Sequence, residues 1–224
     1  MKGSFITFEG GEGAGKSTQI ERIRKRLADA GHEVLVTREP GGSPRAEEIR
    51  AFILAGKAKA LGPAAEALLF SAARLDHLER TIRPALARGS HVLCDRFADS
   101  TMAYQGALGR VQESLLRSLE RIVVAETTPD LTFILDLPAE IGIERSRRRR
   151  EERGEGADRF EAEDARFHRA LRDAFLRIAQ AAPNRCVVID ASHEPDVVER
   201  NLWKTLQERL PQLAGAEARS LHVA

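Results

Sequence analysis

Cysteine and the large aromatic residues are scarce in this chain of 224 residues, which contains two cysteines, one tryptophan and one tyrosine. Cys94 and Cys186 each fall within a predicted strand, and they follow none of the spacings by which cysteines bind metals. We therefore expect two buried, reduced thiols rather than a disulfide. Such thiols are typical of cytoplasmic proteins.

The chain also lacks long apolar runs and a large excess of charge. No apolar run approaches the ~18 residues that a membrane-spanning helix needs, and the first residues do not resemble a leader peptide. The net charge of +1 argues against a protein that coats nucleic acid, although it leaves room for a local basic patch. Hydrophobic residues make up 42% of the chain, which is enough for a large globular core.

A glycine-rich segment near the N-terminus carries the clearest chemical signal. Residues 10–17 read GGEGAGKS and match the pattern G-x-x-x-x-G-K-S/T, in which backbone N–H groups surround phosphate oxygens. Lys16 would reach the β- and γ-phosphates of a nucleotide, and the Ser17 hydroxyl would ligate Mg²⁺. A glycine-rich turn could match this pattern by accident. The context argues against that, because residues 5–8 predict a strand before the loop and residues 20–27 predict a helix after it.

Short apolar strands alternate with helical patterns along the whole chain. This alternation predicts an α/β fold with a doubly wound, parallel, five-stranded sheet between two helical layers. Ligands bind at the carboxyl ends of the strands in such folds, where the glycine-rich loop already lies. No linker or repeat divides the chain, so we expect one domain over residues 1–210 and a poorly ordered tail over 211–224. The expected strands are 5–9, 32–37, 92–94, 131–136 and 186–190.

A long helix is predicted from Pro63 to about Arg88, with a possible kink at Pro84. Its leucines and isoleucines share one face, which we expect to be the core face, and Phe70, Arg74 and His77 lie nearly opposite. An aromatic ring and an arginine one turn apart could stack on a flat base and donate hydrogen bonds to it. The pattern alone favours the other reading, in which Phe70 packs on a neighbouring helix or a second subunit. The apolar face consists of Leu68, Leu75, Ile82 and Leu86.

Charged residues at two other places suit phosphate chemistry. Asp95 and Arg96 end a predicted strand, where the carboxylate could hold Mg²⁺ through water and the arginine could clamp a second phosphate. The alternative is an ordinary ion pair at a strand end. An arginine run at 145–153 is either a solvated helix face or, with the glycines that follow, a lid over about 145–158 that supplies a cation to a transferred phosphoryl group.

Taken together, these separated motifs resemble the bacterial-type thymidylate kinases from about residue 2 to residue 210. The stretch from Asp95 to Gly106, DRFADSTMAYQG, is far more specific than the phosphate loop, which many ATPases share. The other matching motifs are Phe8–Gly10, Thr37–Gly42, Leu69–Phe70 with Arg74 and His77, Leu135–Pro138, Asp158–Phe160 and Ile189–Ser192.

The resemblance implies a nucleoside-monophosphate-kinase fold that transfers the γ-phosphoryl group of ATP to dTMP, giving dTDP and ADP, with Mg²⁺. It also implies a homodimer, and no nucleic-acid or membrane partner. Mg²⁺ would be held by Ser17 and Asp95, and the catalytic residues would be Glu12, Lys16, Arg96, Arg147 and Arg149. ATP would be bound by Gly10, Gly11, Glu12, Gly13, Ala14, Gly15, Lys16, Ser17 and Thr18. The dTMP side would consist of Glu9, Arg38, Phe70, Arg74, Arg96, Ser100, Tyr104 and Gln105.

The same resemblance assigns roles within the acceptor site. Phe70 would stack on thymine, which overturns the packing role favoured by the pattern alone, and Arg74 would donate to its O4 atom. Tyr104 would lie under the deoxyribose and leave no room for a 2′-hydroxyl, and Glu12 would approach the 3′-hydroxyl. Arg38 and Arg96 would hold the phosphate. Arg148 and Arg150 stand next to the arginines that match the lid of this family, so the alignment of the lid is ambiguous. It therefore stays open which of these arginines acts in catalysis.

Three alternatives remain. The first is a kinase for another nucleoside monophosphate or for a deoxynucleoside, against which Phe70, Arg74 and Tyr104 argue. The second is a non-catalytic nucleotide switch, in which the Asp95–Gly106 stretch would have no evident use and for which no guanine-binding motif is present. The third is nucleic-acid binding through the arginine run, which would require a steep salt dependence of DNA affinity.

Overall fold

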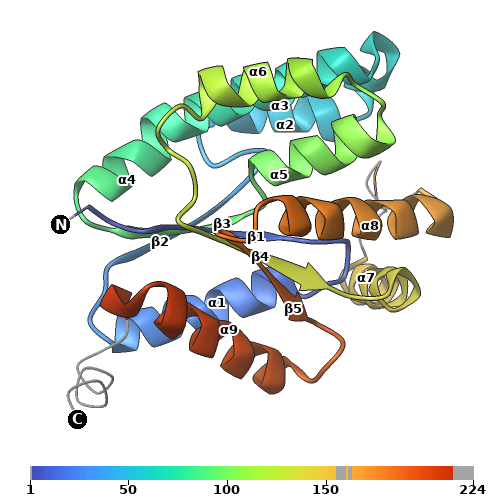
Figure 1. Cartoon of the computed structure of the whole chain (residues 1–224). Coiled ribbons are helices and arrows are strands. Elements are labelled where there is room, and N and C mark those ends of the chain that lie inside the picture. The colour runs from blue at the N-terminus through green and yellow to red at the C-terminus, as the bar shows by residue number, and fades with distance from the viewer. Residues whose placement is uncertain (1, 155–159, 161–162, 214–224) are drawn as a thin grey trace.

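Five parallel strands form one sheet in the order β2-β3-β1-β4-β5 (Figure 1). The computed structural model describes residues 2–154, 160 and 163–213. The five predicted strands and the doubly wound fold class are confirmed. The strands are β1 (Phe5–Glu9), β2 (Val34–Arg38), β3 (His91–Asp95), β4 (Leu131–Asp136) and β5 (Cys186–Asp190).

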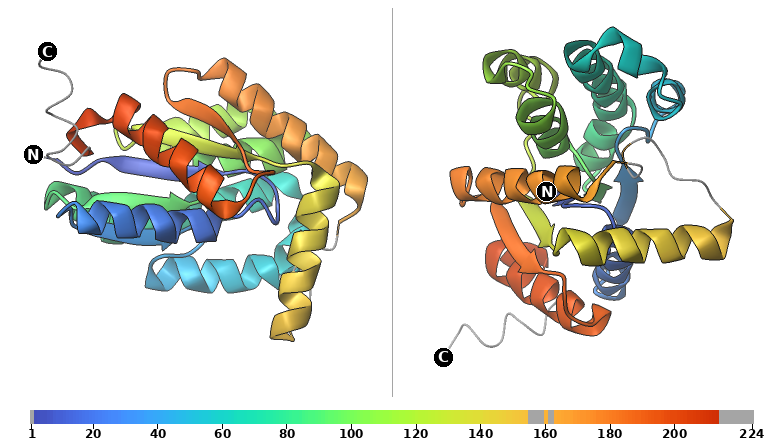
Figure 2. Two further views of the ribbon diagram at one scale, coloured as in Figure 1. Left: turned by 90° about the horizontal axis from the view of Figure 1, so that it is seen from below. Right: turned by 90° about the vertical axis from the view of Figure 1, so that its right-hand side faces the viewer.

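Helices cover both faces of the sheet. Helices α1 and α9 pack together on one face, whereas α4, α5 and α8 lie on the other face, where α2, α3 and α6 form an outer group (Figures 1 and 2). None of the helices in the described ranges is both long and apolar enough to span a bilayer. The α-helices are α1 (Lys16–Asp29), α2 (Pro44–Leu54), α3 (Pro63–His77), α4 (Arg83–Ala87), α5 (Ala98–Thr101), α6 (Glu113–Val123), α7 (Ala139–Arg153), α8 (Ala165–Ala181) and α9 (Pro195–Arg209). Shorter 3-10 and π segments are η1 (Lys57–Leu61), η2 (Leu78–Ile82), η3 (Met102–Leu108) and η4 (Pro211–Leu213).

The central strand β1 is buried along its whole length because helices cover both of its faces. Ile6 and Phe8 pack into the cluster shared with α1 and α9, whereas Phe5 faces α4 on the opposite side of the sheet. This alternation follows from the period of two in a strand. Each fully buried side chain of this size contributes about 1.5–3 kcal/mol. The sheet therefore holds the loop after β1 on a rigid base. Cys94 and Cys186 are buried free thiols, as predicted.

Within α3 the buried and exposed faces are the reverse of those expected from the apolar pattern, whereas Ile82 and Leu86, further along the predicted helix, are buried as expected. Leu68 and Leu75 are 51% and 41% exposed, whereas Arg74 is 4% exposed and His77 is completely buried. The polar side chains can be buried because acceptors from other elements satisfy them, as described below. The π segment η2 follows α3, and Pro84 lies at the start of α4. The helix is thus irregular close to the predicted kink.

The C-terminal boundary of the domain differs from the sequence pattern, and Phe160 lies before α8. At the C-terminal end, η4 extends the packed structure beyond residue 210, and Leu213 is completely buried against the core that contains α9. Residues 211–213 therefore pack with the domain, and the poorly ordered tail stays a prediction. Residues 214–224 lie outside the described part of the chain.

Candidate active site

The glycine-rich loop connects β1 to α1 at the carboxyl edge of the sheet, as the sequence predicted. Its backbone lies directly against α7. A Cβ atom at Gly13 would stand only 2.0 Å from the Gly142 carbonyl oxygen, which shows how close the two segments are. Gly13 also has a φ angle of 68°, which side chains disfavour. Glycine at this position therefore lets the loop and α7 approach closely. As a result, the phosphate loop and the arginine-rich helix meet at one place.

Lys16 lies inside the loop that precedes it. Its Nζ atom donates hydrogen bonds to the carbonyl oxygens of Gly10 and Gly11, at 3.2 and 2.9 Å. Burial lowers the pKa of Lys16, and the nearby Arg96 lowers it further. The loop thus presents a buried ammonium group beside the first turn of α1, where the helix N-terminus adds partial positive charge.

Ser17 and Asp95 come together from two different elements. The Ser17 hydroxyl, in the first turn of α1, donates a 2.8 Å hydrogen bond to Asp95 Oδ2 at the end of β3. The described residues contain no cluster of three or more histidine, cysteine or acidic side chains that could hold a metal. One hydroxyl and one carboxylate nevertheless fit Mg²⁺, which prefers oxygen ligands and takes most of them from water and substrate phosphates.

Arg96 follows β3 in a left-handed backbone conformation, with φ of 68°. Its N–H group donates to the Phe8 carbonyl oxygen at 2.9 Å, and the Cys94 thiol donates to the Arg96 carbonyl oxygen at 3.1 Å. These bonds hold a conformation that is uncommon for a residue with a side chain. Its guanidinium group donates to Glu12 Oε1 at 2.5 Å and lies over the Tyr104 ring at 5.3 Å.

Positive charge dominates the electrostatics at Glu12. Burial on its own would raise the pKa of Glu12, but Arg96, Lys16 and Arg149 outweigh it and lower the pKa to about 2. Glu12 is therefore ionised at neutral pH. Burial raises the pKa of the neighbouring Tyr104 hydroxyl, which donates to Glu12 Oε1 at 3.3 Å. Glu12 thus links the loop to both Arg96 and Tyr104.

A cavity of about 290 Å³ brings most of the predicted residues together. Loop, acceptor-side and arginine-helix residues all contribute to its wall. The predicted residues that line it are Glu12, Gly13, Ala14, Gly15, Lys16, Ser17, Thr18, Phe70, Arg74, Asp95, Arg96, Ser100, Tyr104, Gln105 and Arg149. Gly10 and Gly11 are not among the lining residues, but their carbonyl oxygens hold Lys16.

Three predicted residues lie elsewhere. Arg38 is half exposed beyond the cavity wall and pairs with Glu47 at 3.0 Å. Arg147 is also half exposed and pairs with Glu144 and Glu151 on its own helix. A helix presents neighbouring residues about 100° apart, so only some of the arginines in the run can face the cavity. Arg38 and Arg147 do not line the cavity in this structure, and their roles at the phosphates stay predictions.

Glu9 is the third of these residues, and it lies fully buried behind the cavity. Its carboxylate accepts hydrogen bonds from the Phe97 N–H group at 2.7 Å and from the Ser100 hydroxyl at 2.7 Å. Burial, together with the nearby Asp99 carboxylate, raises the pKa of Glu9 to about 7. Glu9 therefore positions the start of α5 and, through it, Ser100, and its contact with the substrate stays a prediction.

Several lining residues were not identified from the sequence. Arg50 on α2 reaches the cavity and donates to the Pro40 carbonyl oxygen at 2.8 Å. An arginine in an ordinary surface helix carries no signal that would distinguish it. Phe160 packs edge-on against Tyr104, with ring centroids 5.2 Å apart. The remaining unpredicted lining residues are Glu39, Pro40, Leu54, Phe97 and Thr101.

Comparisons with known proteins agree on one family. A family profile described as thymidylate kinase matches residues 8–202. The chain belongs to the thymidylate kinase family. A thymidylate kinase of Rhodopseudomonas palustris is 56% identical over 221 residues, which cover 98% of this chain and 95% of that protein. A thymidylate kinase of a Bradyrhizobium species is 55% identical over 210 residues, covering 93% and 92%. The crystal structure of thymidylate kinase from Ehrlichia chaffeensis superposes with a TM-score of 0.72 at 34% identity, over 92% of this chain and 100% of that one.

Proposed function

We propose that this nucleoside monophosphate kinase transfers the γ-phosphoryl group of ATP to dTMP within the cavity at the carboxyl edge of the sheet. The observation that carries the proposal is that one cavity is lined both by the phosphate loop and by Phe70, Arg74 and Tyr104. A donor nucleotide and an acceptor nucleotide need two such adjoining surfaces. Adjoining surfaces would bring the attacking and leaving oxygens together, and in-line positioning of these atoms is the main requirement of phosphoryl transfer.

The donor side consists of the loop and its two flanking elements. Backbone N–H groups of residues 10–18 would surround the ATP phosphates, with Lys16 neutralising charge on the β- and γ-phosphates. Ser17 and Asp95 would hold Mg²⁺, which supplies further neutralisation of the phosphate charge. Because a phosphate oxygen of dTMP is itself the nucleophile, the reaction requires no strong general base.

The acceptor side lies between α3, α5 and η3. Phe70 would stack on thymine and Arg74 would donate to its O4 atom, with Ser100 and Gln105 nearby. Tyr104 would lie under the deoxyribose. Arg96 would hold the dTMP phosphate, and its contacts with Glu12 and the Gly10 carbonyl oxygen support this by aiming it toward the loop.

The arginine-rich helix would supply the remaining cation. Arg149 lines the cavity and contributes to the low pKa of Glu12, which supports Arg149 as the catalytic arginine. We propose that the end of α7 belongs to a lid whose closure excludes water, which would otherwise accept the phosphoryl group. Of the predicted lid range, residues 155–158 lie outside the described residues.

A homodimer in the cytoplasm fits the remaining surface features. Leu68 and Leu75 on α3 and Leu115 and Ile122 on α6 are exposed, and these two helices contact each other. Exposed apolar side chains on two adjacent helices suit contact with a second copy of the chain. The buried, free thiols are compatible with a reducing compartment. Sedimentation equilibrium would test the assembly, with twice the chain mass of 24.7 kDa as the expected result.

The test of the function is ADP release from Mg-ATP with dTMP, dUMP, dCMP, AMP, GMP and UMP as acceptors. We expect a strong preference for dTMP. A preference for a different monophosphate would still support kinase activity, but it would contradict the assignment of the thymine-binding pocket. Tight ATP binding without turnover of any acceptor would contradict the assignment of the cavity as a phosphoryl-transfer site.

A further inference from the structure

Arg74 has most of its hydrogen-bond donors committed to the protein. Its Nε atom donates to Glu39 Oε2 at 2.7 Å, and its Nη2 atom donates to the Phe97 carbonyl oxygen at 3.1 Å and to Thr101 Oγ1 at 3.0 Å. A guanidinium group has five N–H donors in a fixed plane. The two on Nη1 have no acceptor among the described residues, and Arg74 lines the cavity. The protein therefore leaves one end of the planar group for a ligand.

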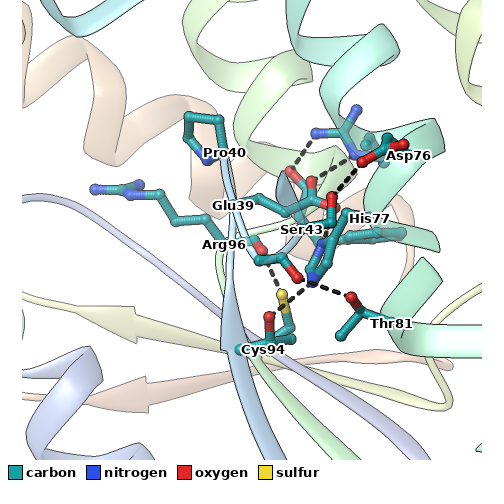
Figure 3. Close-up of polar contacts among 12 residues, drawn as sticks. Glu39, Pro40, Ser43, Asp76, His77, Thr81, Cys94 and Arg96 are labelled. Atoms are coloured by element: carbon teal, nitrogen blue, oxygen red, sulfur yellow. Dashed lines mark hydrogen bonds and ion pairs between the residues drawn. The ribbon is translucent and has the colours of Figure 1, made fainter. Parts of the chain in front are cut away.

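Glu39 sets the direction of that free end. It lies 6% exposed on the loop after β2, and each of its carboxylate oxygens accepts one hydrogen bond. Oε2 accepts from Arg74. Oε1 accepts from His77 Nδ1 at 3.0 Å (Figure 3). Because both oxygens are held, the carboxylate cannot rotate without breaking a buried bond. The bond from Nε to Glu39, together with the two bonds of Nη2, fixes the plane of the guanidinium group.

His77 anchors Glu39 from behind. The ring is completely buried and does not line the cavity. The other ring nitrogen, Nε2, forms a hydrogen bond with the Thr37 hydroxyl, which lies 2.7 Å away. Thr37, His77, Glu39 and Arg74 thus form one hydrogen-bonded chain that runs from β2 to the cavity, and we refer to it as the Arg74 support chain.

The loop that carries Glu39 is itself fixed to the helices. Ser43 Oγ donates to Asp76 Oδ2 at 2.6 Å, and Thr81 Oγ1 donates to the Gly42 carbonyl oxygen at 2.8 Å (Figure 3). A Cβ atom at Gly42 would stand 2.3 Å from His77 Nε2, so glycine is needed for this close packing. These contacts fix the loop that carries Glu39 to α3 and η2.

We propose that Glu39 and His77 are positioning residues for recognition of the base, which aim Arg74 at the carbonyl group on C4 of a pyrimidine. The inference rests on the proposed contact between Arg74 and thymine. An arginine held in this plane offers only donors to position 4 of the ring. A carbonyl oxygen accepts from it, whereas an amino group at the same position places donor against donor. The Arg74 support chain thereby sets the discrimination between 4-oxo and 4-amino pyrimidines.

The test compares dTMP with 5-methyl-dCMP, which keeps the methyl group and the sugar and replaces the 4-carbonyl by an amino group. Glu39→Gln is expected to raise KM for dTMP about tenfold and to lower the ratio of kcat/KM values for the two substrates by a similar factor. KM for ATP and kcat should change less than about twofold. The matched control is Glu199→Gln, which removes a carboxylate paired with Arg22 and Arg26 away from the cavity and should leave the ratio unchanged.

Thr37→Val tests the same proposal at the outer end of the Arg74 support chain, including the case in which Glu39→Gln does not fold. Thr37→Val retains the shape and removes the outermost hydroxyl of the Arg74 support chain. It should lower the substrate ratio in the same direction, by about threefold. If the Arg74 support chain only stabilised the fold, both variants would have a changed unfolding temperature and an unchanged ratio of kcat/KM values for dTMP and 5-methyl-dCMP. That result would overturn the proposal.

A double-mutant cycle separates this inference from the proposed function. In an Arg74→Gln background no guanidinium group remains to be positioned, so adding Glu39→Gln should not lower the ratio further. An equal further loss in that background would show that Glu39 acts independently of Arg74 and would overturn the inference. If Arg74→Gln alone leaves both the KM for dTMP and the ratio unchanged, the base contact of the proposed function fails as well.

Discussion

Arg96 and Glu12 form an ion pair of 2.5 Å that joins the end of β3 to the phosphate loop. Both side chains line the cavity, and the pair holds them between the surfaces proposed for ATP and for dTMP. Breaking a partly buried pair of this kind leaves one charge with less compensation. In the proposed function, the pair would keep a cation close to the transferred group before any substrate binds.

Removal of the Lys16 ammonium group is expected to abolish most turnover while the fold persists. Lys16→Ala should lower kcat at least about 100-fold, because charge on the transferred phosphoryl group then lacks its main protein cation in the loop. Steady-state kinetics measures this loss, and circular dichroism confirms the fold. Lys25→Ala, at an exposed position on the same helix, is the control. Activity close to that of the wild type in Lys16→Ala would refute the loop assignment.

The two lid arginines should differ in their effect. Arg149→Ala is expected to lower kcat about 100-fold, because Arg149 lines the cavity and acts on Glu12. Arg147→Ala should change kcat by less than about threefold, since its partners lie on the exposed face of α7. The comparison of kcat at saturating ATP and dTMP decides between them. A larger loss in Arg147→Ala would show that the register of the closed lid differs from the present one.

Tyr104 should act as the gate for the sugar. Its ring lies between Arg96 and Phe160, so it occupies a fixed place in the cavity. Tyr104→Ala is expected to lower the ratio of rates with dTMP and ribo-TMP about tenfold, because space for a 2′-hydroxyl appears. Tyr104→Phe keeps the ring and should keep the ratio. An unchanged ratio of the dTMP and ribo-TMP rates in Tyr104→Ala would contradict the role of Tyr104 in excluding the 2′-hydroxyl.

Glu9 should make stability fall with rising pH. Its folded-state pKa of about 7 lies above the ordinary value of 4.5, so the folded protein retains a proton that the unfolded chain releases. The contribution is fully present below about pH 4.5 and is lost as the pH rises through about 7, by up to about 3 kcal/mol. Urea unfolding of Glu9→Gln should lack this slope between pH 5 and 8. Parallel pH profiles for the variant and the wild type would contradict the raised pKa.

Contiguous features were predictable from the sequence. The strand at residues 5–9, the glycine-rich loop and helix α1 follow one another directly, so local pattern is sufficient to place Lys16 and Ser17. Asp95 was predictable for a related reason, because the carboxyl ends of parallel strands share one edge. The 2.8 Å contact between Ser17 and Asp95 confirms that these two residues meet there.

The faces of α3 could not be predicted in this way. A helical wheel assigns apolar residues to the core, and Leu68 and Leu75 are nevertheless exposed. Arg74 and His77 take the buried side because Glu39 arrives from a loop that precedes them by 35 and 38 residues. Nothing in the local pattern around residue 74 indicates that a carboxylate will be there.

The sequence by itself determined the alternation of strands and helices, the phosphate loop and the residue types of the site, because each of these depends on short-range periodicity or on one contiguous motif. The tertiary structure alone decided which arginine of 145–153 faces the cavity, that Glu9 supports Ser100, and that Glu39 holds Arg74. The free energy of burying a charged group depends on partners that other segments supply, and only the folded chain brings those partners within hydrogen-bond distance.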